Sequence, residues 1–184
     1  IPINKAINYS EKKFIIPTYI LVALIGDGYI CGGRTSISIP DFQMQIQEEI
    51  LKLLPNNLKL TKNFSDSCPS YNIINKEFDG ENIFNREIKK LKLNVKSGQK
   101  FIPKEYLYSS IEQRLELLKG LMDTDGSSDK NRINYHTTSE QLSKDVAELV
   151  QSLGGQSIIN FYDRSKENKS NEYRINVRMS ICPF

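Results

Sequence analysis

The sequence contains few of the side chains that bind transition metals. It has one histidine, His136, and three cysteines, Cys31, Cys68 and Cys182, which show no C-x-x-C spacing. A structural zinc site needs four thiolate or imidazole ligands at short intervals, so these residues do not indicate one. We interpret the cysteines as structural thiols. Any metal bound by this protein is therefore expected to have oxygen ligands.

Long apolar segments are absent too. The longest apolar run covers residues 19–25, far fewer than the about 20 that cross a bilayer, and no signal peptide precedes it. We therefore expect a soluble, intracellular protein without a membrane partner, in the cytoplasm, at the nucleoid or in an organelle. The 184 residues, 39% of them hydrophobic, can build the core of one large domain or two small ones.

Basic residues are unevenly distributed, although the net charge is only +3. Residues 86–104 contain one acid, Glu87, and seven basic residues: Arg86, Lys89, Lys90, Lys92, Lys96, Lys100 and Lys104. This asymmetry favours a polyanion such as nucleic acid as the partner. The alternative interpretation is a solvated face joined to a connecting loop.

Two segments, 98 residues apart, share a pattern in which a short apolar helix end stops at an aspartate and a glycine. They are residues 21–28 (LVALIGDG) and 118–126 (LKGLMDTDG). Asp27 and Asp125 would each lie at the C-terminal end of a helix, where the macrodipole is already negative and an acid is unfavourable without a cation. A single Asp-Gly pair is common turn chemistry. Two in matching contexts suggest a metal site.

The hydrophobic pattern predicts the same order of elements twice. In the first half we expect helix 18–26, strands 29–31 and 34–39, helix 41–54 capped by Asp41, strands 58–64 and 71–76, and helix 80–93. In the second half we expect helix 111–124 after a capping box, strand 132–137, helix 139–153, and strands 157–162 and 172–179. The order helix, two strands, helix, two strands thus recurs, and a third helix is visible only in the first copy. Such a duplication predicts a pseudo-twofold assembly.

The positions of small residues predict how the two copies of the repeat pack against each other. Gly26 and Ala23 lie on the first acid-tipped helix, and Gly120 and Thr124 lie on the second. Small side chains on one helix face allow two backbones to approach closely, so we expect these helices to pack side by side. Their ends would bring Asp27 and Asp125 together.

The predicted strands alternate between apolar and polar residues, which gives each sheet one polar face. Basic and amide side chains spaced by two suit phosphates and base edges in a major groove. We expect His136 to act as a contact on this face and not as a metal ligand. The predicted DNA-binding residues are Arg34, Ser36 and Ser38 in the first copy, and Arg132, Asn134, His136, Arg174, Asn176 and Arg178 in the second.

At the two motifs the chain resembles the LAGLIDADG homing endonucleases, in the single-chain form that carries two motif copies. Residues 120–126 (GLMDTDG) are close to the family pattern, and residues 23–28 (ALIGDG) are looser. Residues 100–107 (KFIPKEYL) are similar to the K-x-I-P stretch that precedes the second motif in intein-borne members. Residues 135–142 (YHTTSEQL) are similar to the strand-to-helix segment that follows that motif. The resemblance spans residues 17–179.

The resemblance implies an α+β fold of two αββαββα repeats, related by a pseudo-twofold axis, with saddle-shaped antiparallel DNA-binding sheets. On this basis we divide the chain into a lead-in segment (residues 1–13), a first repeat (14–97), a linker (98–108) and a second repeat (109–184). Both motif copies lie in one chain, so we expect a monomer.

The resemblance also implies the activity: a site-specific endonuclease that hydrolyses phosphodiester bonds of double-stranded DNA at a long recognition site and leaves short 3′ overhangs. Asp27 and Asp125 would hold Mg²⁺, with the preceding residues Gly26 and Thr124 beside it. Mn²⁺ or Ca²⁺ could occupy the same site. Lys100 matches the family's active-site lysine, whose ammonium can stabilise charge on the phosphorane or position the water. The alternative for Lys100 is a solvated loop lysine.

Some positions depart from the family pattern. Val22 replaces the usual glycine of the first motif, and a second active-site lysine has no clear match, with Lys166 and Lys169 as candidates. The sequence shows neither a splicing nucleophile at its first residue nor His-Asn at its last, so we do not expect protein splicing. The alternatives to a nuclease are an RNA-splicing maturase, a cleavage-deficient DNA-binding protein on the same scaffold, or a decayed remnant. Retention of both motif acids favours the nuclease.

Overall fold

The computed structural model describes residues 5–31, 34–63, 69–129 and 132–180. The first repeat consists of α1 (Thr18–Asp27), β1 (Gly28–Cys31), β2 (Arg34–Ser38), the 3₁₀ turn η1 (Asp41–Gln43), α2 (Met44–Leu53), β3 (Leu58–Asn63), β4 (Ser70–Asn75) and α3 (Ile83–Lys90). The linker contains η2 (Ser97–Gln99) and α4 (Lys104–Leu107). The second repeat consists of α5 (Ile111–Asp125), β5 (Gly126–Asp129), β6 (Arg132–Thr137), α6 (Glu140–Ser152), β7 (Gln156–Tyr162), η3 (Ser165–Glu167) and β8 (Glu172–Arg178).

The two repeats have the same sheet topology. Each forms a four-stranded antiparallel sheet, in the order β1-β2-β4-β3 and β5-β6-β8-β7. The register matches as well, because Gly28 pairs with Ile37 in the first sheet and Gly126 pairs with Tyr135 in the second. The predicted α+β fold with two antiparallel sheets is therefore confirmed. Within the described residues the closing helix, α3, occurs in the first repeat alone, as the hydrophobic pattern had indicated.

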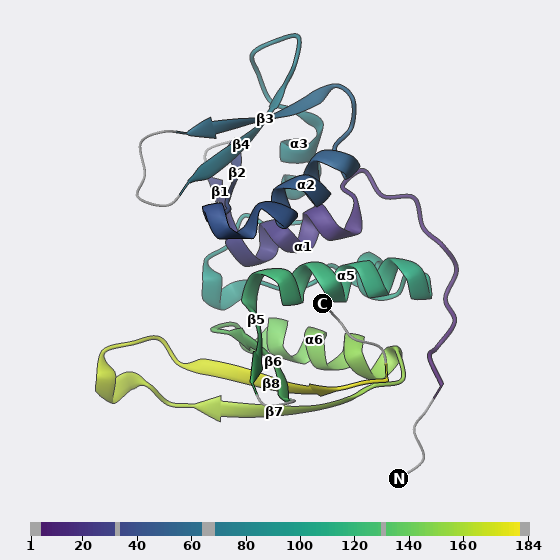
Figure 1. Ribbon diagram of the computed structural model, residues 1–184, viewed down its shortest axis with the longest axis vertical. Coiled ribbons are helices and arrows are strands. Elements are labelled where there is room, and N and C mark those ends of the chain that lie inside the picture. Colours follow the sequence, from purple (N-terminus) through teal and green to yellow (C-terminus); the bar gives the residue numbers. More distant parts are fainter. Residues whose placement is uncertain (1–4, 32–33, 64–68, 130–131, 181–184) are drawn as a thin grey trace.

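Helices α1 and α5 lie side by side at the centre of the molecule (Figure 1). A Cβ added at Gly26 would lie 2.4 Å from Thr124 Oγ1, and one added at Gly120 would lie 2.6 Å from a methyl carbon of Val22. The backbones therefore approach as closely as glycine allows, which confirms the predicted packing. Tyr19 Oη also donates a hydrogen bond across the interface to Asp123 Oδ2 at 2.8 Å.

Helix α1 is buried from Thr18 to Ile25, so it forms the middle of a core that both repeats share. The apolar sheet faces turn towards this core, with Ile37 and Ile73 in the first sheet and Ile175 and Val177 in the second. None of the helices that the structure describes has both the length and the apolar content to cross a membrane.

Four elements differ from the sequence-based expectation, and one of them is α3, which covers Ile83–Lys90 within the expected helix 80–93. The second helix was expected to begin at Asp41, but α2 begins at Met44 after a 3₁₀ turn, and the Asp41 carboxylate lies 3.6 Å from Lys62 Nζ without capping the helix. The short elements β5 and α4 were not predicted, because four residues are too few for a hydrophobic period to show.

The segment before α1 runs along the outside of the molecule to the second repeat (Figure 1). Ile7 N donates to Ser152 O at 2.8 Å, and Gln113 Nε2 donates to Lys12 O at 2.6 Å. The buried guanidinium of Arg114 donates to the carbonyls of Ile7, Ser109 and Ser152. The lead-in segment thus ties the start of the first repeat to the body of the second.

Candidate active site and nucleic-acid interface

The two motif aspartates are the last residues of the paired helices. Asp27 ends α1 and Asp125 ends α5, and each is followed by a glycine in extended conformation whose N–H bonds back into the helix. A Cβ at Gly28 would lie 2.2 Å from Leu24 O, and one at Gly126 would lie 2.3 Å from Met122 O. Only glycine permits this sharp change from helix to strand. The Asp-Gly pair is therefore what places each acid at the start of a sheet.

The two carboxylates lie close enough to influence each other. The pKa of Asp125 is raised to about 6, mainly by burial and then by the negative charge of Asp27, while Lys100, His136 and Tyr135 oppose the shift. Burial also raises the pKa of Asp27, and the positive charge of Lys100 lowers it. Two acids with raised pKa values in one place are typical of a functional site.

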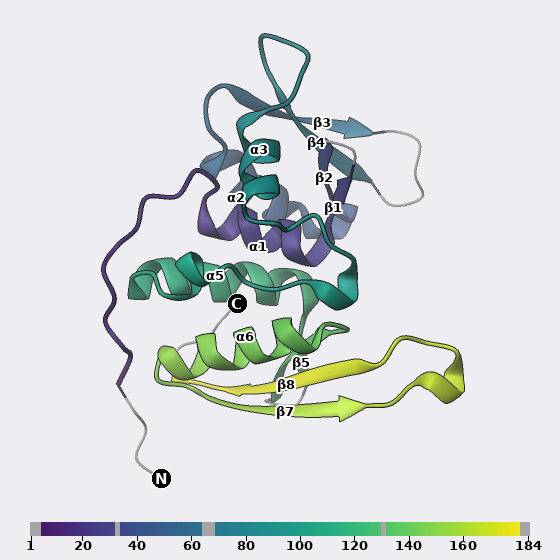
Figure 2. The same ribbon diagram turned by 180° about the vertical axis from the view of Figure 1, so that it is seen from behind.

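Lys100 reaches this site from the linker, which passes the ends of α1 and α5 in the rear view (Figure 2). Its ammonium Nζ donates a hydrogen bond to the Gly26 carbonyl oxygen at 2.8 Å. Burial lowers the pKa of Lys100, and the charges of Asp125 and Asp27 raise it. The structure thus brings together the three residues that the sequence indicated as catalytic.

Tyr135 is a site residue that the sequence analysis missed. Its hydroxyl is buried, and within the described residues it has no hydrogen-bond partner at a normal distance and angle. It nevertheless lies near enough to the Asp125 carboxylate to lower the pKa of that group slightly. The register of the β5–β6 hairpin identifies Tyr135 as a neighbour of the acid, because Tyr135 pairs with Gly126 and so stands directly opposite the end of the second motif.

A cavity of about 430 Å³ opens beside Asp125, whereas Asp27 is not among its lining residues. It is lined by Gly26, Lys100 and Asp125 on one side, and by His136, Arg164 and Glu172 of the second sheet and its hairpin on another. The wall of the second repeat is thus strongly polar.

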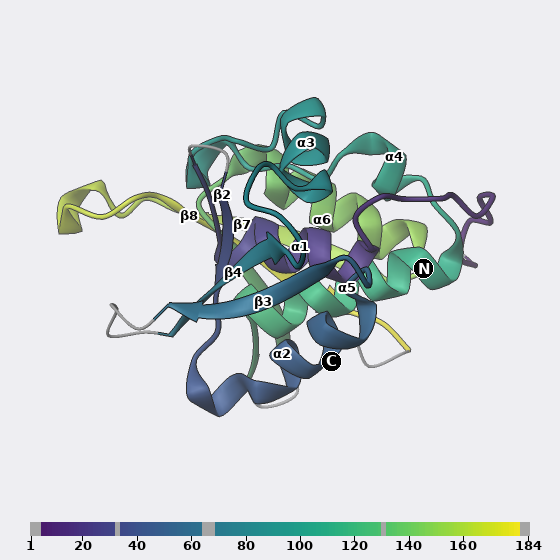
Figure 3. The same cartoon turned by 90° about the horizontal axis from the view of Figure 1, so that it is seen from above.

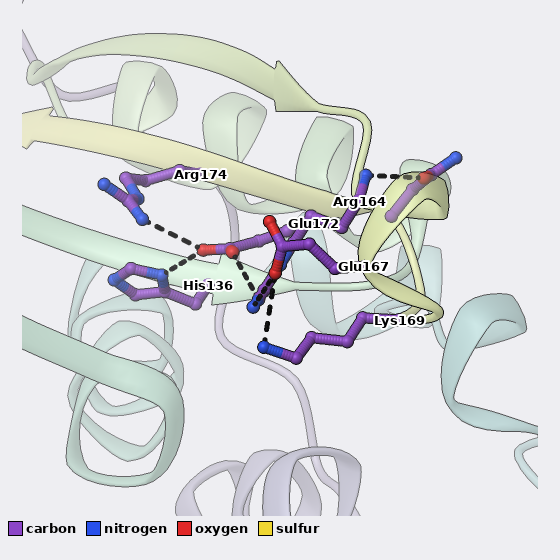
Figure 4. Close-up of polar contacts among 7 residues, drawn as sticks. His136, Arg164, Glu167, Lys169, Glu172 and Arg174 are labelled. Carbon is purple, nitrogen blue, oxygen red and sulfur yellow. Dashed lines mark hydrogen bonds and ion pairs between the residues drawn. The ribbon is translucent and has the colours of Figure 1, made fainter.

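Glu172 is the centre of a network of charges beside the cavity (Figure 4). Its carboxylate contacts His136 Nδ1 at 2.7 Å, Arg164 Nη1 at 3.1 Å and Arg174 Nη2 at 3.3 Å. The hydrogen bond from His136 is the main cause that lowers the pKa of Glu172. Nε2 of His136 lies 2.9 Å from Ser127 Oγ. His136 is therefore hydrogen-bonded to two neighbours on the sheet face.

The candidate second lysines lie on the β7–β8 hairpin, which extends beyond the helices in the view from above (Figure 3). Lys169 forms an ion pair with Glu167 at 3.2 Å, and Lys166 lies in η3. Neither residue lines the cavity. In the described part of the chain, Lys100 is the only lysine among the cavity residues.

The basic run is divided between α3 and the linker. The exposed Lys89 pairs with Glu81, and the exposed Lys90 pairs at 3.0 Å with Glu87, which is buried. These two lysines fit the interpretation as a solvated face. Lys100 instead lies half-buried at the acids.

The polar face of the second sheet carries the predicted DNA-binding side chains of that repeat. Asn160 Nδ2 donates to Asn176 Oδ1 at 2.8 Å, and Asn176 Nδ2 donates to Asn134 Oδ1, so three amides form a chain across the strands. Arg132 and Arg178 are exposed. The face therefore offers amide and guanidinium groups at neighbouring positions.

The corresponding face of the first sheet carries shorter side chains. Ser36 and Ser38 are partly exposed, and Ser36 pairs in register with Asn72. Arg34 begins β2, but its side chain lies outside the described residues. The two sheets thus have the same backbone arrangement but carry different side chains at equivalent positions of their polar faces.

The oxygen ligands at the helix ends fit a small divalent cation. Within the residues described, no cluster of three or more His, Cys, Asp or Glu side chains could hold a metal alone. Mg²⁺, however, is commonly bound by one or two carboxylates together with substrate phosphates. Asp27, Asp125 and the Gly26 carbonyl are hard oxygen donors, and the unpaired Tyr135 hydroxyl adds another polar atom beside them. The Thr124 hydroxyl instead donates to Leu121 O at 3.0 Å in its own helix.

The sequence was compared with known proteins. Residues 112–184 match the family model of the LAGLIDADG-like domain. The chain is also similar to a replicative DNA helicase DnaB of Mycobacterium intracellulare, at 29% identity over 151 residues. This match covers 82% of the chain but 21% of that relative, so the chain spans about a fifth of the helicase's length.

The fold is similar to solved structures of the homing endonuclease I-DmoI. Mesophilic variants of I-DmoI match with a TM-score of 0.58 at 16% identity, over 89% of this chain and 88% of that one. I-DmoI in complex with DNA and Mn matches with a TM-score of 0.58 at 14% identity, over 88% of both chains. I-DmoI in complex with DNA and Ca matches with a TM-score of 0.60 at 14% identity, over 89% of this chain and 83% of that one. At these identities the likeness establishes the fold.

Proposed function

We propose that this chain, whose second repeat is a LAGLIDADG-like domain and whose two repeats have the fold of I-DmoI, is a metal-dependent, site-specific endonuclease of double-stranded DNA. It would act as a monomer at a long recognition site, because both motif copies lie in one chain. The scissile phosphates would face each other across the minor groove, so that cleavage leaves short 3′ overhangs.

The observation that carries this proposal is the meeting of two half-buried acids and one lysine at the ends of α1 and α5. The charges of Asp27 and Asp125 influence each other, and Lys100 bonds to the carbonyl next to Asp27. Holding two carboxylates together is unfavourable unless a cation joins them. A structural role alone would not require this arrangement.

The proposed chemistry divides between a bound cation and the residues of the chain. When bound, Mg²⁺ would supply charge stabilisation to the attacking and leaving oxygens of a phosphate. Asp27 and Asp125 would hold the cation, aided by backbone carbonyls of Gly26 and Thr124, since the last carbonyls of a helix lack partners within it. Lys100 would place its ammonium against charge that develops on the phosphate.

The two sheets would bind the DNA on either side of the cleavage point. β1 and β5 follow directly after the two acids, so each sheet begins at the active site. Their polar faces carry the serine, asparagine, histidine and arginine side chains that suit phosphates and base edges. The DNA complexes of I-DmoI support this placement through the shared fold.

The match to part of a much longer helicase supports one further aspect of the proposal. The matched region covers 21% of that relative. This agrees with an endonuclease unit carried inside a larger protein, as the intein-type K-x-I-P stretch at Lys100 suggested.

The test is cleavage of a randomised double-stranded DNA library in the presence of Mg²⁺. We expect one long site to be enriched, and Asp27→Asn or Asp125→Asn to reduce cutting by about 10³-fold or more, because several kcal/mol of charge stabilisation are lost. Asp123→Asn is the matched control, because this acid is bonded to Tyr19 in the helix interface and its loss should leave cutting intact.

Other outcomes would assign a different function. Specific DNA retained without cutting would indicate a DNA-binding protein that has lost cleavage. RNA binding with intron splicing that survives both aspartate substitutions would indicate a maturase. Either result would overturn the nuclease proposal.

A further inference from the structure

The segment that carries Lys100 lies between two short helical turns and has extended backbone, with φ −63° and ψ 150° at Lys100 itself. It therefore has no backbone ladder of its own to fix its position. A lysine side chain is flexible, so an ammonium held at the acids requires a backbone that is held elsewhere.

Two residues of α6 provide the contacts that hold this backbone. Ser139, the N-cap of α6, donates from Oγ to the Lys100 carbonyl oxygen at 2.6 Å. Asp145, on the second turn of the same helix, accepts a hydrogen bond from the Ile102 amide at 2.8 Å through Oδ2. The residues on either side of Phe101, Lys100 and Ile102, are thus fixed to one helix of the second repeat.

Asp145 is buried, which indicates that its carboxylate does more than fill space in the core. It is 6% exposed and shares the inner face of α6 with Leu142, Val146 and Leu149. Its other oxygen accepts from Gln141 Nε2 at 2.8 Å, and within the described residues it forms no ion pair. A buried carboxylate costs free energy that an apolar side chain at this position would not.

The contacts connect both repeats through the linker. Helix α6 of the second repeat holds the linker backbone, and the Lys100 ammonium bonds to Gly26 of the first repeat. We propose that Asp145 and Ser139 are positioning residues for DNA cleavage, which hold the linker so that the Lys100 ammonium stays at Asp27 and Asp125. This inference rests on the proposed function for its catalytic consequence.

The decisive measurement is a double-mutant cycle between positions 145 and 100 on the selected cleavage site. Asp145→Ala should lower kcat by about 10- to 100-fold, since a misplacement of about 1 Å has effects of this size, and should leave the Kd for DNA unchanged. Asp145→Asn keeps an acceptor oxygen for the Ile102 amide and should restore most of the activity. In the Lys100→Met background, Asp145→Ala should have no further effect, because it acts only through Lys100.

A second measurement does not depend on cleavage. In protein with ¹³C-labelled lysine, the Lys100 signal, assigned by its loss in Lys100→Met, should lie apart from the signals of the exposed lysines, because its ammonium is held against the Gly26 carbonyl oxygen. Asp145→Ala should move it to the ordinary position, whereas Glu148→Ala should not, because Glu148 lies on the outer face of α6 and bonds to Tyr108.

The outcomes separate the two proposals. If the wild type cuts no DNA, the proposed function fails, and the Lys100 signal still decides whether Asp145 holds this side chain. An unchanged Lys100 signal in folded Asp145→Ala would overturn the positioning role. So would an equal loss of kcat with and without Lys100, since that would reflect a general structural defect.

Discussion

The two repeats share a backbone plan but surround their acids differently. In the first repeat the strand residue opposite the motif glycine is Ile37, and in the second it is Tyr135. On the next strand the residues are reversed, with Tyr71 beside Ile37 and Ile175 beside Tyr135. Exchanging one aromatic between neighbouring strands thus places a buried hydroxyl next to Asp125. Because the fold is duplicated, the two acids occupy the same position in their repeats. Their buried neighbours differ, and these neighbours affect the protonation of each acid separately.

The polar faces of the sheets differ in the same way. Positions equivalent in register carry Ser36 and Ser38 in the first repeat, but Asn134 and His136 in the second. Long amide and basic side chains reach further into a groove than serine hydroxyls and make bidentate contacts to bases. On the proposed function, the second sheet should therefore contribute more of the sequence specificity than the first.

Among the differences between the two repeats, the largest effect is expected from Lys100, which has no counterpart at the other end of the active site. Lys100→Met should reduce cleavage by about 10²- to 10³-fold, because it removes a positive charge aimed at the reacting phosphate. Lys166→Met and Lys169→Met, on the hairpin of the second repeat, should change the rate by less than about threefold. Single-turnover rates on the selected site would measure this. A large loss from either hairpin lysine would show that the active site is more symmetric than the structure indicates.

The next effect concerns the helix interface, where glycine and threonine face each other. Gly26→Ala should lower the free energy of unfolding by about 1–3 kcal/mol through overpacking, because its Cβ would lie 2.4 Å from Thr124 Oγ1. Gly26→Ala combined with Thr124→Gly, which moves the small residue to the other helix, should be more stable than Gly26→Ala alone.

Urea denaturation of these variants would measure the effect. Gly98→Ala is the control, since a Cβ there would meet nothing closer than Thr138 O at 3.8 Å, and it should be close to neutral. No rescue by Thr124→Gly would mean that the close approach of the helices does not limit stability.

A smaller effect is expected at the sheet faces, at two positions that correspond in register. Asn176→Ala should relax base preference at one half-site by about 1–2 kcal/mol, since it removes the central member of the amide chain. Asn72→Ala, its counterpart in the first sheet, should relax the other half-site by under about 1 kcal/mol. Sequencing of sites cut from a library would show both profiles. Equal losses in the two half-sites would contradict the expected asymmetry.

The smallest effect concerns stability and pH. The pKa of Asp125 is raised to about 6 in the folded chain, above its ordinary 3.8, so the folded state binds this proton more tightly than the unfolded state. The contribution of this group to stability is thus present below pH 4 and is lost as the pH rises through about 6. Asp125→Asn should therefore raise the free energy of unfolding by about 1 kcal/mol at pH 8, and the gain should fade towards pH 4.

Asp27→Asn should have an effect in the same direction, since burial raises the pKa of Asp27 as well. Thermal unfolding at pH 4, 6 and 8 without metal would test both variants. The same titration should weaken metal binding below pH 6, because the ligand must lose its proton. A gain that is constant with pH would show that the carboxylate charge is not its cause.

The sequence alone was sufficient for the features that depend on local pattern. The apolar run of α1, the capping box of α5 and the alternation along β6 and β8 follow from hydrophobic periodicity and helix-end chemistry. The close approach at Gly26 and Gly120 followed from small residues on one helix face. The repeated Asp-Gly motif also indicated that Asp27 and Asp125 would meet, because a duplicated element tends to assemble with its copy.

Only the tertiary structure decided which residues surround those acids. The strand register places Tyr135 beside Asp125. Asp145 bonds to Ile102 in the Lys100 segment, although the two residues are 43 positions apart in the sequence. The pairing of β6 with β8 and the fold of the hairpin bring His136, Arg164 and Arg174 into contact with Glu172. Periodicity reports which face of an element is buried, whereas partners across the core depend on the register and packing of the whole chain. For that reason the sequence determined the acids and their scaffold, and the folded chain determined their pKa values and the position of Lys100.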